Sequence, residues 1–151
     1  MTGVPTRPLF DLSLEVGAPH DLRGADGHGK LIFHVTGGRF DGDRLRGRVL
    51  PVSGDWVVAA PGQSRVDVRL LLETDDGALV YMTYRGVHTL GAEHRAELAA
   101  GRDLDPASYY FRTAPMFETA ADRYDWLNRV VAVGIGERTR SEVRYTVHEV
   151  L

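Results

Sequence analysis

The sequence contains no cysteine among its 151 residues. Disulfide bonds, a thiolate nucleophile and cysteine-ligated zinc are therefore excluded. The sequence also has no apolar run near the ~20 residues that a membrane-spanning helix needs. Its N-terminal stretch MTGVPTRPLF lacks the charged start and apolar run of a signal peptide. We therefore expect a cytoplasmic protein with no membrane partner.

Clustered positive charge is missing as well. The formal net charge is −3 and the isoelectric point is about 6.0, with basic residues scattered among acids. Nucleic-acid backbones bind clustered Lys and Arg, so we expect no nucleic-acid partner. The length fits one domain, which we place at residues 9–151 after a loose lead-in over residues 1–8.

Short alternating segments dominate the chain. In residues 65–74 four apolar residues share one face, whereas Asp67 and Arg69 share the other. Turns are predicted at residues 37–43, at Ser53-Gly54 and at residues 75–77. Further strands are predicted at residues 9–16, 30–36, 44–50, 55–60, 78–87, 108–114, 129–137 and 142–150.

Helical segments are few. Residues 92–101 predict a short helix with Gly101 as its stop, and residues 119–128 predict one or two helical turns. Because helices do not alternate with strands, a parallel sheet is disfavoured, and an all-β antiparallel barrel is preferred over a sandwich. The charged face of residues 65–74 fits either a polar lumen or a wet outer wall, and periodicity leaves both open.

Longer stretches carry a family resemblance. They include GGRFDGDRLRGRVLP, SGDW, VDVRLLLETDDGALVYMTYRG, DPASYYFRTAPMFET and RYDWLNRVVAVGIGER. In this order and spacing they resemble domain-of-unknown-function family 3237, the UPF0311 proteins, over nearly the whole chain from Leu9. The resemblance implies a small antiparallel β-barrel of calycin or lipocalin-like shape. Because members are largely uncharacterised, it implies a fold rather than an activity.

Individual residues match or depart from the family pattern. The chain has Val52-Ser53-Gly54 where the family usually has a Gly-Gly pair before Asp-Trp. It has Ala120-Ala121 where the family usually has Gly-Asp, which we interpret as a candidate position for a specialised ligand preference. The matching residues are Asp55, Trp56, Asp67, Arg69, Thr74, Asp76, Gly77, Tyr110, Phe111, Arg112, Phe117, Glu118, Trp126 and Asn128.

Three residues are candidates for catalysis. Glu118 stands among aromatic residues whose burial would raise its pKa toward neutrality and suit it to proton transfer. A salt bridge with a nearby arginine is the alternative. Arg69 could hold a carboxylate or enolate while Asp67, two residues away, acts as base. An ion pair between neighbouring strands is the alternative for these two.

Aromatic and polar residues supply the candidate ligand-binding set. The phenols of Tyr81, Tyr84 and Tyr110 could donate hydrogen bonds to an oxyanion, or could pack in the core or at the rim. Asp55 and Trp56 form a polar–aromatic pair that either lines the lumen or plugs it. The remaining candidates are Arg112 and Phe117, together with Trp126 and Asn128, which we interpret mainly as anchors.

Metal and cofactor motifs are weak. The six histidines form neither H-x-H nor H-E-x-x-H, although His34 and His148 could meet across a barrel. Gly134-Ile135-Gly136 is too short for a dinucleotide fingerprint, and no G-x-S-x-G marks a serine nucleophile. We therefore expect neither a metal nor a cofactor.

Two functions are compatible with these residues. The first is a cofactor-independent acid–base enzyme, of isomerase, cyclase or lyase type, acting on a small, partly aromatic or polyketide-like molecule of secondary metabolism. The second is a non-catalytic barrel that carries or senses a small molecule. Either would bind its ligand in the lumen, and unpaired strand edges would also allow a homodimer.

Overall fold

The computed structural model describes residues 3–151. The helices are short: α1 (Ala92–Ala99) and two 3-10 helices, η1 (Pro106–Ser108) and η2 (Asp122–Arg129). Within the described residues no helix is long and apolar enough to cross a membrane. The strands are β1 (Thr6–Val16), β2 (His20–Asp21), β3 (Gly29–Asp41), β4 (Arg46–Ala60), β5 (Gln63–Thr74), β6 (Leu79–His88), β7 (Phe111–Glu118), β8 (Ala132–Arg138) and β9 (Val143–Val150).

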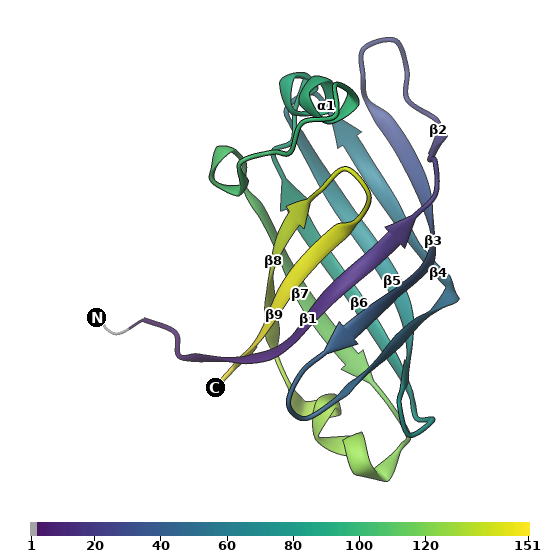
Figure 1. Ribbon diagram of the computed structural model, residues 1–151, viewed down its shortest axis with the longest axis vertical. Helices are drawn as coiled ribbons and strands as arrows, with labels where there is room; N and C mark the ends of the chain where they lie inside the picture. The colour runs from purple at the N-terminus through teal and green to yellow at the C-terminus, as the bar shows by residue number, and fades with distance from the viewer. Residues whose placement is uncertain (1–2) are drawn as a thin grey trace.

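Eight strands close into an antiparallel barrel, which confirms the predicted fold class (Figure 1). Neighbouring strands follow the order β1-β9-β8-β7-β6-β5-β4-β3, and pairing of β1 with β3 completes the ring. The short strand β2 pairs with β3 alone. Thr6, Arg7 and Pro8 pair with the end of β9, so the barrel begins earlier than the predicted lead-in of residues 1–8 allowed.

The alternation of each strand separates lumen from solvent. In β5 the side chains of Val66, Val68 and Leu70 are buried, whereas Arg65 and Arg69 are exposed. In a barrel this small the buried face points inward, because the lumen is filled by side chains. The charged face of β5 is therefore the outer wall, which decides between the two alternatives that periodicity left open.

Two predicted turns are wrong because bulges continue the strands. β3 runs through Gly37-Gly38 to Asp41, and β4 runs through Ser53-Gly54. The pairing of β3 with β4 shifts by one residue between Val35 and Arg39. Since a one-residue shift reverses which side chains face inward, Phe40 becomes a core residue. Gly38 has φ 150°, and a Cβ there would lie 2.2 Å from the Ser13 carbonyl oxygen.

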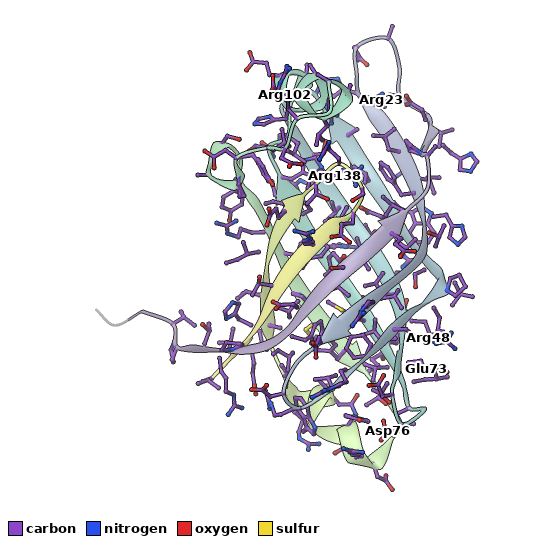
Figure 2. All side chains as sticks on the ribbon, viewed as in Figure 1. Arg23, Arg48, Glu73, Asp76, Arg102 and Arg138 are labelled. Carbon is purple, nitrogen blue, oxygen red and sulfur yellow. The ribbon has the colours of Figure 1, made fainter. Side chains whose placement is uncertain are left out.

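One end of the barrel is closed by η2 (Figure 1). Asp76, in the β5–β6 turn and labelled in Figure 2, accepts hydrogen bonds from the Tyr124 hydroxyl and the Arg123 guanidinium at 2.8 and 2.9 Å. Asn128 exchanges two side-chain hydrogen bonds with the backbone of Thr119. These contacts fix η2 against the ends of β6 and β7. The predicted helical turns at residues 119–128 are thus a 3-10 plug.

The two halves of the lumen are filled differently. Beside η2, Phe10 packs against Phe40 and Phe117 with ring centroids 5.6 and 6.0 Å apart. Toward α1, the inward residues of β8 include Gly134 and Gly136, and a Cβ on Gly136 would lie 2.6 Å from the Phe111 ring. Aromatic packing therefore closes the η2 half, whereas the α1 half keeps a cavity.

Candidate functional site

A largely apolar cavity lies in the α1 half of the barrel and has a volume of about 380 Å³. This is the size range of small-molecule pockets. The helix α1 and the loop before it border the cavity through Leu90, Arg95 and Leu98. Much of the wall is apolar and comes from Val16, Leu31, Phe33, Val57, Val66 and Phe111.

Asp55 is the carboxyl group of this cavity. It is an inward residue of β4 and lies where the pairing with β5 skips Trp56 and Val57. In that gap its Oδ1 atom accepts a hydrogen bond from the Asp67 backbone amide at 3.1 Å. Burial nevertheless disfavours the charged form and raises the pKa of Asp55 to about 7. Asp55 can therefore both donate and accept a proton near neutral pH.

Two buried phenols stand beside this carboxyl group. Tyr84 and Tyr145 pack edge to face, with ring centroids 5.2 Å apart. Burial is the largest cause that raises the pKa of Tyr84, and the neighbouring Tyr145 adds to the shift. Burial is also the largest cause that raises the pKa of Tyr145, and the negative charge of Asp55 adds to the shift. Both phenols stay protonated at neutral pH and serve as hydrogen-bond donors.

Two buried hydroxyl groups have no protein partner within residues 3–151. They are the Tyr84 hydroxyl and the Ser64 Oγ, which lines the cavity. Buried polar groups in proteins are normally hydrogen-bonded, and unpaired ones mark places where a ligand or water completes the network. The Ser64 hydroxyl therefore leaves free hydrogen-bonding capacity in the cavity wall, and the Tyr84 hydroxyl lies behind the wall beside Tyr145.

His88 is a neutral imidazole in the cavity wall. Burial, assisted by the positive charge of Arg95, lowers its pKa to about 4. Its Nδ1 atom accepts a hydrogen bond from the Leu90 amide at 3.3 Å, which places the proton of the neutral ring on Nε2. His88 is thus a further donor in the cavity.

Three arginines complete the polar lining: Arg23, Arg95 and Arg138. Figure 2 shows Arg23 and Arg138 in the half of the molecule that carries α1. Arg23 forms two side-chain hydrogen bonds with Asp21, at 3.0 and 2.8 Å. Burial lowers the pKa of both Arg95 and Arg138. The cavity thus combines a titratable carboxyl, neutral donors and fixed cations.

The three predicted catalytic residues lie outside the cavity. Glu118 is exposed on the outer face of β7, so the burial that the prediction required is missing. It forms no ion pair within residues 3–151, because Arg123 pairs with Asp76 instead. Asp67 and Arg69 border a shallow hollow on the outer wall, where Arg69 lies over the Trp56 ring at 5.2 Å. The alternatives to catalysis were a salt bridge of Glu118 with an arginine and an ion pair involving Asp67 and Arg69. Neither occurs within the described residues.

The predicted ligand-binding residues divide between the two faces. Asp55 and Tyr84 belong to the buried cluster, whereas Trp56, the neighbour of Asp55, faces outward. Tyr81 and Tyr110 are exposed on the outside. Arg112 lies over the Tyr110 ring at 5.0 Å.

The remaining predicted residues belong to the η2 end. Phe117 is a core residue there, and Trp126 lies under the Arg44 guanidinium at 4.3 Å. Asn128 anchors η2, in agreement with its interpretation as an anchor. Ala120 and Ala121 border an outer hollow at this end, far from the cavity lining. The family departure at these alanines therefore lies outside the cavity.

Sequence reasoning missed Tyr145, His88, Arg95 and Arg138. The signal for Tyr145 was present, because it alternates with Val143 and Val147 on an apolar face. No comparable signal marked the others, since strand pairing and α1 bring them to one place. The predicted meeting of His34 and His148 does not occur, because both occupy outward strand positions. No cluster of three metal-binding side chains occurs within residues 3–151.

Comparison with known proteins places the chain in a family. The model of the protein family of unknown function DUF3237 matches residues 5–150. The chain belongs to this family. It is 33% identical over 150 residues to UPF0311 protein RPA1785 of Rhodopseudomonas palustris, covering 97% of this chain and 96% of that protein. The resemblance seen in the sequence is thereby confirmed.

Solved structures of DUF3237 relatives share the barrel. The crystal structure of RPA1785 gives a TM-score of 0.90 and covers 100% of both chains. A β-barrel-like protein from Acinetobacter baumannii gives 0.83 at 37% identity, covering 100% of this chain and 98% of that one. A more distant relative is hydroalkoxylation enzyme phnH of Penicillium herquei, 28% identical over 134 residues, covering 86% of this chain and 75% of that protein.

Proposed function

We propose that this DUF3237 protein is a cofactor-independent acid–base enzyme that isomerises or cyclises a small unsaturated molecule in its lumen. The observation that carries the proposal is Asp55, a cavity carboxyl group whose pKa is raised to about 7. A group with a pKa near the working pH is an efficient proton donor and acceptor. Two protonated phenols, Tyr84 and Tyr145, lie near it, and His88 lines the same cavity as a further donor.

The proposed reaction is an intramolecular addition of a hydroxyl group to a carbon–carbon double bond. Neutral Asp55 donates its proton to one alkene carbon, and the substrate oxygen forms a bond to the other. The hydroxyl proton then passes to the Asp55 carboxylate, which restores the acid. Product and substrate are isomers, so the step needs no oxidant, reductant or second substrate.

Neighbouring groups have defined roles in this proposal. The Asp67 amide fixes Oδ1 of Asp55, while Oδ2 has no protein partner within residues 3–151 and remains for the substrate. Tyr145 lines the cavity and donates its phenolic hydrogen, which suits it to orient the nucleophilic oxygen. The apolar wall shields the developing cationic carbon from water.

The likeness to the hydroalkoxylation enzyme phnH supports cyclisation over the other acid–base reactions. Hydroalkoxylation, the activity that names phnH of Penicillium herquei, is an addition of O–H across a double bond. At 28% identity over 86% of the chain, this likeness supports the reaction class and leaves the substrate open.

A second candidate is a carrier or sensor that binds the same kind of molecule without turnover. The observation in its favour is the wall of the cavity, which is formed largely by apolar side chains such as Leu31, Phe33 and Phe111. Asp55, Ser64 and Tyr84 argue for the enzyme, because uncompensated polar groups have no use in a purely apolar carrier.

Turnover of model substrates in D₂O tests the proposal. Phenols with an ortho-allyl or ortho-prenyl chain are incubated with the protein and followed by chromatography and mass spectrometry. The expected product is a cyclised isomer with one deuterium at the newly protonated carbon. Asp55→Asn should lower the rate by about 10²-fold or more, because it removes the acid.

The matched controls are Asp67→Asn and Glu118→Gln, which change carboxylates on the outer wall and should leave the rate near that of the wild type. Full activity of Asp55→Asn would refute the proposal. Binding of these phenols without any isomer formation would favour the carrier instead.

A further inference from the structure

Arg95 and Arg138 are two cations of the cavity without a counter-ion. Both line it, and neither side chain forms a hydrogen bond or ion pair within residues 3–151. Burial of an unpaired charge is costly, so buried arginines are normally paired. Arg138 is half-buried and Arg95 is more exposed, and the partial burial of each lowers the pKa of its guanidinium.

Many other arginines of the chain are paired, whereas the exposed Arg39, Arg65, Arg69, Arg85 and Arg112 form no ion pair within the described residues. Arg23, the third arginine of the cavity, is held by Asp21. Ion pairs of the same kind hold many surface arginines, namely Arg7, Arg44, Arg48, Arg102, Arg123, Arg129, Arg140 and Arg144. Arg95 and Arg138, which line the cavity, have no such partner within residues 3–151.

The cavity itself does not neutralise them. Among the described residues that line it, Asp55 is the one acid. Its carboxyl is partly protonated near neutral pH, because burial raises its pKa to about 7. Two fixed positive charges thus face at most one partial negative charge. His88 remains neutral because burial and the charge of Arg95 both disfavour its protonation.

We propose that the ligand of this cavity carries a carboxylate, which Arg95 and Arg138 bind while its apolar body lies against Phe33, Val57 and Phe111. Guanidinium groups suit this role, because their planar set of donors matches a carboxylate. Arg95 comes from α1 and Arg138 from the end of β8, so a bound carboxylate bridges the helix and the barrel wall. The inference rests on the proposed function and names the substrate class of the same site.

Calorimetric titration with two matched probes tests the charge preference. The probes are 2-naphthoate and its neutral isostere 2-naphthamide. The wild-type protein should bind naphthoate at least about 10-fold more tightly, since a charged hydrogen-bonded pair contributes about 1.5–3 kcal/mol. Absence of naphthoate binding, or equal binding of both probes, would overturn the inference.

Variants assign the preference to particular residues. Arg95→Met and Arg138→Met should each weaken naphthoate binding about 10-fold and leave naphthamide binding unchanged. Arg138→Lys should keep part of the preference, because it keeps the charge. The control is Arg65→Met, an exposed arginine on the outer face of β5 that should change neither affinity. A preference that survives in the Arg95→Met/Arg138→Met double variant, shown to be folded by circular dichroism, would refute the assignment.

Failure of this inference is distinguishable from failure of the proposed function. Asp55→Asn should still prefer naphthoate, because the arginines remain. Loss of turnover in Asp55→Asn without any charge preference in the wild type refutes the carboxylate alone. Full turnover in Asp55→Asn together with the charge preference refutes the acid–base role alone.

Discussion

The carboxyl group of Asp55 and the backbone amide of Asp67 are joined by a hydrogen bond of 3.1 Å across a gap between β4 and β5. The bond uses the amide of Asp67 and leaves its side chain on the outer wall. It favours the ionised form of Asp55, but burial outweighs it. A carboxyl group that is fixed in place and still titrates near neutrality has consequences for stability as well as for chemistry.

Asp55→Asn is expected to remove a pH dependence of folding. The folded pKa of about 7 lies above the ordinary aspartate value of 3.8, so folding favours the protonated form. The stabilisation is full below pH 4 and is lost as the pH rises through 7, on the order of 4 kcal/mol. Urea unfolding from pH 4 to 8 should show that this loss is absent in Asp55→Asn. A variant that loses stability with rising pH as steeply as the wild type would contradict the shifted carboxyl.

His88→Asn is expected to have the opposite effect. The folded pKa of about 4 lies below the ordinary histidine value of 6.5, so folding favours neutral imidazole. Its contribution is full above pH 6.5 and is lost as the pH falls toward 4, on the order of 3 kcal/mol. Asn can still accept the Leu90 amide proton but cannot titrate. Relative to the wild type, His88→Asn should be less sensitive to acid in the same urea series, and equal sensitivity would argue against a buried neutral ring.

Phe117→Ala should be strongly destabilising. The side chain is 4% exposed and packs against Phe10 in the η2 half of the lumen. Its removal should cost about 3–5 kcal/mol in unfolding free energy. The neighbouring Met116, 55% exposed on the outer face, is the control, because Met116→Ala should change stability by no more than about 0.5 kcal/mol. Similar losses in both variants would contradict the assigned faces of β7.

Gly136→Ala should disturb the cavity wall. A Cβ at this position would lie 2.6 Å from the Phe111 ring, so the ring must move. Overpacking of this kind costs about 1–3 kcal/mol. Gly17→Ala is the control, since its Cβ would meet no atom closer than 4.0 Å. Thermal unfolding of both variants tests the contact, and a Gly136→Ala protein as stable as the Gly17→Ala protein would show that the ring is not fixed there.

Much of the fold could be predicted because alternation reports burial directly. Residues 65–74 illustrate this, since Val66, Val68, Leu70 and Leu72 are all lumen residues of β5. The turns at Gly37-Gly38 and Ser53-Gly54 were predicted wrongly because glycine marks a bulge as readily as a turn. Only the hydrogen-bonded partner strand distinguishes the two.

The candidate site could be predicted only in part, for a related reason. A dense run of polar residues in β7 and η2 drew attention to Glu118, yet alternation within β7 places it outward. Of the predicted ligand-binding residues, Asp55 lines the cavity, whereas its neighbours there, Tyr145, His88 and Arg138, come from distant segments. Burial raises the pKa of Asp55, and strand pairing determines which groups lie next to it. Neither can be deduced from the residues adjacent to Asp55 in the sequence.

The helix α1 contains no buried residue, whereas the opposite end of the barrel is held by the Asp76 network and a cluster of phenylalanines. Folding stability and ligand choice are therefore assigned to opposite ends of one lumen. Substitutions within α1 should cost little folding free energy, whereas Leu90 and Tyr109 beside it belong to the core. Under the proposed function, substitutions in α1 would change which ligand binds and would leave both the Asp55 carboxyl group and the packed η2 end unchanged.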